Sequence, residues 1–60
     1  MKNQTFFTVD EVGIMLRKHR VTIQKMAINK TIPAFKIGRE WRIDKEELYE
    51  WIEKQKVKAI

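Results

Sequence analysis

The chain has no cysteine, one proline, two glycines and a single histidine among its 60 residues. Without cysteine there is no disulfide framework and no thiolate metal site. His19 would have to share a zinc ion with carboxylates alone, so we expect neither a metal nor a cofactor. No apolar run approaches the roughly 18 residues of a spanning helix, and residues 1–4 lack the apolar core of a signal peptide. We therefore expect a cytoplasmic protein with no membrane partner.

The residues that enzymes use are also scarce. His19 has no obvious acid or thiol partner that would activate a nucleophile. The carboxylates that follow one another at 44, 46 and 47 are better explained by helix capping than by paired acid–base chemistry. Gly13 and Gly38 stand alone, so no glycine-rich phosphate loop is present. We expect the protein not to be an enzyme.

What the chain does have is positive charge, gathered in its middle. The formal net charge is +5, and hydrophobic residues make up 43% of the chain. Residues 15–42 carry eight of the 13 Lys and Arg against one acid, whereas each flanking segment has a net charge of −1. A basic centre of this kind can hold a polyanion electrostatically, although a solvated basic face without a partner is the alternative.

At this length one domain over residues 1–60 is expected, and its stability is marginal because a chain of this size buries only about 60% of its unfolded surface. A capping box at Thr8 and Glu11 predicts the start of a helix, directly after an extended segment at Phe6-Phe7. Val9, Val12 and Leu16 then place an apolar stripe on one face of that helix.

A second helix is predicted over about residues 20–29, because Ile23, Met26 and Ala27 share one face. The polar residues 17–19 separate it from the first helix. Two helices joined by about three residues are typical of a helix-turn-helix.

After Pro33 the pattern changes to a period of two, which predicts a β-hairpin. The apolar residues Phe35, Ile37, Trp41 and Ile43 alternate with Lys36, Glu40 and Arg42. Gly38 and Arg39 suit a two-residue type II′ turn. We expect the apolar side chains to face inward, the cations to face outward, and the hairpin to lean on the helices because two strands alone are barely stable.

Asp44 as N-cap and Glu47 at the third position predict a third helix that ends near Gln55. Its core face carries Leu48, Trp51 and Ile52. The fold class is thus α+β, in the order helix, helix, two-stranded hairpin, helix.

The exposed face of the second helix carries the side chains with which proteins read DNA. With Ile23 buried, this face holds Arg20, Val21, Thr22, Gln24 and Lys25. Gln pairs with adenine, Arg pairs with guanine and Val touches the thymine methyl group, whereas Thr22 suits a phosphate. The alternative is a small protein-contact patch formed by Val21 and Ile28.

The hairpin would contribute Lys36, Arg39 and Arg42 to the DNA backbone or the minor groove, although the three could also be solvated cations that protect an edge ribbon. The positions of Trp41 and Trp51 favour core anchors over platforms for stacking bases. RNA binding is disfavoured, because no stacking aromatic is expected on the outer face of the ribbon.

These residues together resemble a known family. The segments Thr8–Val12, Thr22-Ile23, Ile32–Ile43 and Leu48–Ile52 resemble the excisionase-type, MerR-like winged helix-turn-helix DNA-binding domain, over about residues 6–53. The stretch Ile-Pro-Ala-Phe-Lys-Ile-Gly-Arg-Glu-Trp-Arg-Ile is the most specific part. Lys30 stands where the family has a glycine.

The resemblance implies that the second helix enters the major groove and that the hairpin is the wing. It also implies a recombination directionality factor that assists an integrase of a mobile element, or a small stand-alone transcriptional regulator. Integrase and further copies of the same chain are then possible partners on DNA. A protein-interaction adaptor is the alternative from a different class.

Overall fold

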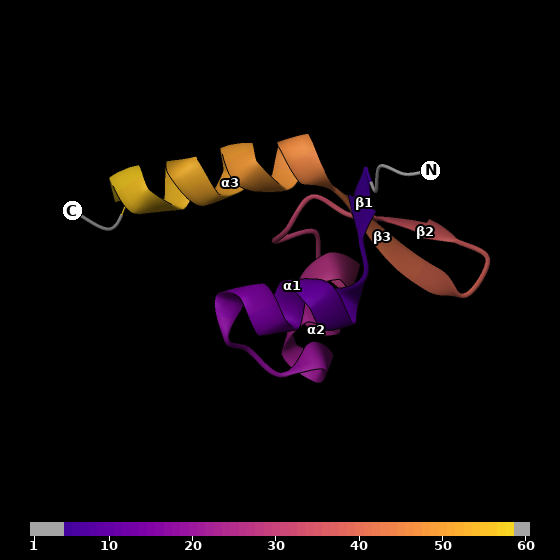
Figure 1. Ribbon diagram of the computed structural model, residues 1–60. Helices are drawn as coiled ribbons and strands as arrows, with labels where there is room; N and C mark the ends of the chain where they lie inside the picture. The colour runs from indigo at the N-terminus through magenta and orange to yellow at the C-terminus, as the bar shows by residue number, and fades with distance from the viewer. Residues whose placement is uncertain (1–4, 59–60) are drawn as a thin grey trace.

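The computed structural model describes residues 5–58, which form three helices and three strands (Figure 1). In chain order these are β1 (Phe6–Phe7), α1 (Val9–Leu16), α2 (Arg20–Ile28), β2 (Phe35–Ile37), β3 (Glu40–Asp44) and α3 (Lys45–Lys58). Figure 1 shows α1 and α2 together on one side, α3 crossing above them, and the β2–β3 hairpin projecting outward. The fold is a small α+β winged helix-turn-helix, as expected.

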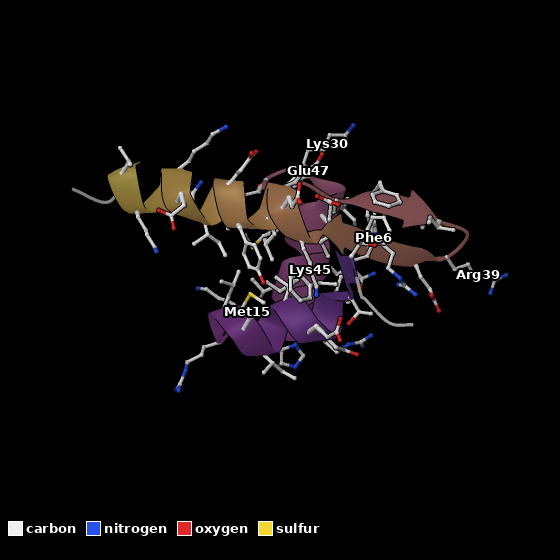
Figure 2. All side chains as sticks on the ribbon, turned by 45° about the horizontal axis from the view of Figure 1, so that its top comes forward. Phe6, Met15, Lys30, Arg39, Lys45 and Glu47 are labelled. Atoms are coloured by element: carbon white, nitrogen blue, oxygen red, sulfur yellow. The ribbon has the colours of Figure 1, made fainter. Side chains whose placement is uncertain are left out.

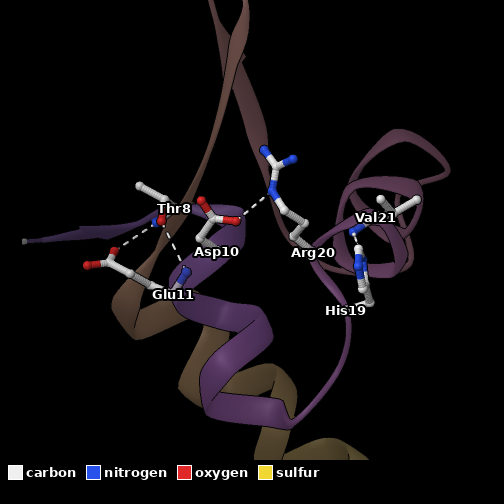
Figure 3. A network of polar contacts seen from close by, with 6 residues as sticks. All are labelled: Thr8, Asp10, Glu11, His19, Arg20 and Val21. Atoms are coloured by element: carbon white, nitrogen blue, oxygen red, sulfur yellow. Dashed lines mark hydrogen bonds and ion pairs between the residues drawn. The ribbon is translucent and has the colours of Figure 1, made fainter.

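The start of α1 is the predicted capping box. The Thr8 hydroxyl accepts a hydrogen bond from the Glu11 backbone N–H at 3.1 Å, and the Glu11 carboxylate accepts one from the Thr8 N–H at 2.9 Å (Figure 3). At the other end Arg17 adopts the left-handed conformation with φ 57°, which ends the helix. This reversal sends the chain into α2 after two further residues, so the predicted helix-turn-helix is confirmed.

The sheet contains one strand more than the sequence predicts. β3 lies in the middle and pairs antiparallel with both β1 and β2. The short segment Phe6-Phe7 is therefore the third strand, and it anchors the hairpin to the core. Gly38, with φ +61°, opens the two-residue turn between β2 and β3, as a type II′ turn requires.

The prediction that all apolar residues of the hairpin face inward is wrong. A two-residue turn pairs Ile37 with Glu40, so Ile37 shares a face with Glu40 and lies opposite Trp41 and Ile43. Ile43 is fully buried, whereas Ile37 is 62% exposed. The apolar side chains of β2 and β3 therefore lie on opposite faces of the hairpin, and only those of β3 face the core.

The same register places Lys36 on the face of the hairpin that carries Trp41. Its ammonium lies 5.8 Å from the centre of the Trp41 ring. Lys36 and Arg42 thus lie on opposite faces of the hairpin, and the expected single outward row of cations is not formed. Lys36 nevertheless remains exposed, with its ammonium over the Trp41 ring.

The core joins every element of the structure except β2. It is formed by seven buried side chains: Phe7, Val12, Ile23, Ala27, Ile32, Ile43 and Leu48. Trp41 and Trp51 are half-buried and pack against this cluster, which confirms their prediction as core anchors. Asp44 caps α3 by accepting from the Glu47 N–H at 3.0 Å, and the helix runs to Lys58, three residues beyond the predicted end.

Among residues 5–58, no helix is long and apolar enough to cross a bilayer. The described part of the chain also holds no group of three or more histidine or acidic side chains that could bind a metal ion.

Candidate nucleic-acid interface

A shallow groove runs between the start of α1, the first turn of α2 and the β2–β3 hairpin. Four residues predicted to bind DNA line it: Arg20, Gln24, Arg39 and Arg42. Trp41 and Glu40 line it from the hairpin, and Thr8, Val9 and Asp10 line it from the start of α1. The groove thus collects side chains from three separate segments.

The beginning of α2 is built by a cap that the sequence analysis missed. The Nδ1 atom of His19 accepts a hydrogen bond from the Val21 N–H at 3.1 Å (Figure 3). The imidazole therefore takes the place of the Ser, Thr, Asp or Asn that usually satisfies the first free amides of a helix. His19 thus has a structural task in positioning the helix that carries Arg20 and Gln24.

Arg20 and Gln24 are four residues apart on α2 and so lie one above the other on the same face. The Arg20 Nε atom donates to Asp10 Oδ1 at 2.6 Å across the helix-turn-helix. Figure 3 shows the two terminal nitrogens of Arg20 turned away from Asp10, on the side of the hairpin. The pair is exposed, with 58% of the Arg20 side chain and 61% of the Asp10 side chain accessible.

Arg42 is held more completely than Arg20. One terminal nitrogen donates to Glu40 Oε1 at 2.5 Å and the other donates to the Trp41 carbonyl at 2.9 Å. Its side chain is only 32% exposed. Arg39 instead lies at the tip of the hairpin and projects into solvent (Figure 2).

The other predicted DNA-binding residues lie outside this groove. Val21, Thr22 and Lys25 are exposed on α2, as the helical pattern predicts, but they do not line the groove with Arg20 and Gln24. Lys36 is exposed beside Trp41. The structure thus brings four of the eight predicted residues together and leaves four around them.

Two acidic residues in the groove were not singled out from the sequence. Asp10 and Glu40 each pair with an arginine that faces the same space. The Asp10 pair joins residues ten positions apart, so no local spacing rule points to it. Both pairs reduce the net positive charge that the groove presents to a polyanion.

The expectation that the outer face of the ribbon lacks aromatics is also wrong. Phe6 of β1 and Phe35 of β2 lie on the face opposite Trp41 and contact each other edge to face, with ring centres 5.5 Å apart. They are 42% and 39% exposed. The rings meet because β3 brings β1 and β2 to its two sides, a pairing that the sequence analysis did not include.

Comparisons with known proteins agree with this architecture. The model of the helix-turn-helix domain family matches residues 6–56. The chain therefore belongs to the helix-turn-helix domain family, and the class that the fold and the family define is a DNA-binding helix-turn-helix protein.

One relative among curated proteins is the uncharacterized protein YvgK of Bacillus subtilis (strain 168). It is 28% identical over 51 residues, which cover 85% of this chain. The matched region spans 17% of the length of YvgK, so the likeness concerns one part of that larger protein. No solved structure matches the chain.

Proposed function

We propose that the chain binds duplex DNA sequence-specifically, with α2 in the major groove and the β2–β3 hairpin as the wing on the backbone or in the minor groove. The observation that carries the proposal is the groove in which Arg20 and Gln24 face Arg39 and Arg42. The first pair has base-reading chemistry, and the second pair supplies cations for phosphates. A recognition helix beside a basic hairpin can engage both parts of a duplex.

The eight residues predicted from the sequence divide into two roles under this proposal. On α2, base reading and helix-proximal phosphate contacts fall to Arg20, Val21, Thr22, Gln24 and Lys25. On the hairpin, Arg39 reaches a phosphate from the tip, while Lys36 and Arg42 flank it on opposite faces. Residues 1–60 act as one domain in this scheme.

The biological role that we propose is that of an excisionase-type accessory factor, which assists an integrase of a mobile element. The resemblance of residues 32–43 to that family supports it. A stand-alone transcriptional regulator is the alternative, because both roles use the same DNA-binding domain. A monomer of this size reads few base pairs, so an integrase or further copies of the chain would extend the recognised site.

A protein-interaction adaptor is the candidate function from another class, and one observation favours it. Leu16 and Met26 of the helix-turn-helix lie beside Trp51 and Ile52 of α3 in a second, mostly apolar groove, which shares no lining residue with the groove of Arg20, Arg39 and Arg42. Val21 and Ile28 are exposed on α2 as well. The affinity for a partner bound through such apolar surfaces would not depend on the salt concentration.

The experiment that tests DNA binding is a titration of random and selected duplexes at several salt concentrations. Neutralised phosphates release counterions, so we expect log Kd to depend steeply on log salt, with one sequence bound preferentially. Arg39→Ala should weaken binding to all duplexes alike and reduce the salt slope by about one unit. Lys54→Ala, on α3 outside the groove, is the matched control and should leave the slope unchanged.

Weak binding to all duplexes, without a preferred sequence, would contradict the proposal. The protein-interaction adaptor would then be the function to test. If a preferred sequence emerges, its location beside a recombination site or in a promoter distinguishes the two proposed roles.

A further inference from the structure

We propose that Asp10 is a positioning residue that sets Arg20 to read guanine, and that Gln24 reads an adenine within about two base pairs of it. This inference rests on the proposed function and deepens it, because it specifies part of the DNA sequence that the protein recognises.

The first step is the way in which Arg20 is held. Asp10 accepts the hydrogen bond of the Nε atom, at 2.6 Å. Within residues 5–58 the two terminal nitrogens of Arg20 make no hydrogen bond. A guanidinium contacts guanine O6 and N7 with two parallel hydrogen bonds, for which Nη1 and Nη2 are suitable donors. The contact with Asp10 therefore restrains the side chain while it leaves its base-reading atoms free.

Arg42 shows the opposite arrangement in the same groove. Its two terminal nitrogens already donate to Glu40 and to the Trp41 carbonyl. Such an arginine has to give up these partners before it can make a two-pronged contact with a base. Arg39 lies at a turn tip, where reach suits a phosphate. Of the three arginines that line the groove, Arg20 is thus the one whose side chain is restrained through Nε while both of its terminal nitrogens can still donate to a base.

The second step is the position of Arg20 on α2. It is the first residue of the helix, and the N-terminal residues of a recognition helix are those that contact base edges. Gln24 follows one turn later on the same face and also lines the groove. Glutamine contacts adenine N6 and N7 with two hydrogen bonds.

The spacing of the two side chains limits the spacing of the two bases. Four residues of α-helix rise about 6 Å. Base pairs are stacked about 3.4 Å apart, so a helix that follows the groove places the two contacts about two base pairs apart. We therefore expect the recognised sequence to contain a guanine and an adenine that are adjacent or separated by one base pair.

Two other arrangements predict different results for the removal of Asp10. If Asp10 only repels phosphates, its removal strengthens binding to every sequence and leaves base preference unchanged. If Asp10 positions Arg20 for a phosphate, its removal weakens binding to all sequences equally. Only the positioning of Arg20 for a base changes the preference at one base pair.

The test is a selection of preferred duplexes followed by affinity measurements on every single-base variant, for wild type, Asp10→Ala and Gln24→Ala. We expect Asp10→Ala, which removes the acceptor of the Arg20 Nε–H, to lower the preference for guanine at one position by about tenfold, because a base contact made through two hydrogen bonds discriminates against the other bases. Preference at the adenine position should remain. Gln24→Ala should show the reverse pattern.

The matched control is Glu53→Gln, which removes the acid of an exposed ion pair with Lys56 on α3, away from the groove. It should leave both base preferences unchanged. Thermal unfolding of Asp10→Ala should stay close to that of wild type, because an ion pair between exposed side chains contributes little to stability. A loss of preference at guanine is then not a consequence of unfolding.

A second readout uses the free protein and does not depend on DNA. In proton–nitrogen NMR spectra, the Arg20 Nε–H should exchange with water more slowly in wild type than in Asp10→Ala. An unprotected Nε–H in wild type overturns the positioning role, even if no DNA sequence is found.

The failures of the two proposals are distinguishable. Absence of any sequence preference contradicts the proposed function. A clear preference that lacks a neighbouring guanine and adenine, or that Asp10→Ala leaves intact, contradicts this inference alone.

Discussion

At the scale of single residues, Gly13 determines how closely the two helices of the helix-turn-helix approach. It is buried within α1, and a Cβ atom at this position would lie 2.7 Å from the Lys18 carbonyl oxygen. The Lys18 N–H also donates to the Gly13 carbonyl at 2.8 Å. The turn into α2 therefore closes directly on this glycine.

We predict that Gly13→Ala destabilises the protein. Alanine gains about 1 kcal/mol of helix propensity over glycine, but a clash with backbone costs about 1–3 kcal/mol and requires the turn to shift. Urea unfolding should show a net loss of about 1 kcal/mol. Ile14→Ala is the control, since Ile14 is 80% exposed and should change stability little. A Gly13→Ala protein more stable than wild type would show that the turn moves freely.

Lys30 presents the opposite case to Gly13, because it has a side chain where the backbone conformation favours glycine. It follows α2 with φ 64°, a left-handed conformation that costs a residue with a Cβ atom about 1–2 kcal/mol. The family that the sequence resembles has a glycine here, and the backbone angle supplies the physical reason.

Lys30→Gly should therefore stabilise the protein by about 1 kcal/mol in chemical denaturation. Lys54→Gly, within α3, makes the same change of side chain in helical backbone and should destabilise by a similar amount. Equal effects of the two substitutions would refute the strain at Lys30.

At the scale of elements, the stability of α2 depends on its N-terminal cap, which the sequence analysis did not identify. Its buried face consists of Ile23 and Ala27, with Met26 half-buried, and its remaining surface is polar or exposed. His19 supplies the acceptor for one of its first amides. The helix proposed to read DNA thus begins at a hydrogen bond that the His19 Nδ1 atom accepts from the Val21 N–H.

We predict that His19→Ala lowers stability by about 1 kcal/mol, the usual cost of losing an N-cap. His19→Asn restores an acceptor and should recover most of that loss. Denaturant midpoints measure both variants. If His19→Ala and His19→Asn are equally destabilised, the ring acts through packing and not through its acceptor.

The hairpin shows how far element-level prediction from the sequence extends. The strands and their turn were predicted at the correct positions, because Gly38 and the period of two are local signals. The facing of Phe35 and Ile37 was wrong, because apolar residues in both strands were assigned to one side, whereas the register pairs Ile37 with Glu40. The extended segment Phe6-Phe7 was predicted, but its pairing with β3 was missed, because two residues carry no period of their own.

At the scale of the whole molecule, a small core has to hold three helices and a sheet together. Leu48 of α3 is fully buried in that core, and Trp51 and Ile52 of the same helix pack against it. A domain of 60 residues has a total stability of roughly 3–9 kcal/mol at 0.05–0.15 kcal/mol per residue. One large cavity therefore removes a major fraction of it.

Leu48→Ala should cost about 2–5 kcal/mol and leave a measurable unfolded population in circular dichroism at room temperature. Val57→Ala, on the exposed end of α3, is the control and should unfold like wild type. A cooperative, nearly unchanged transition for Leu48→Ala would mean that α3 is not integral to the core.

The sequence by itself determined the features that depend on neighbours in the chain. The capping box at Thr8, the bounds of α2, the hairpin turn at Gly38 and the concentration of positive charge in residues 15–42 all arise from local backbone preferences or from composition. These are the features by which helix-turn-helix architecture was predicted.

Only the tertiary structure decided which distant residues meet. It places Asp10 on Arg20, brings Gln24 into one groove with Arg39, and pairs Phe6 with Phe35 across β3. These contacts depend on how helices pack and how strands pair. Such geometry is set by the burial of the common core, and short-range sequence patterns do not record it.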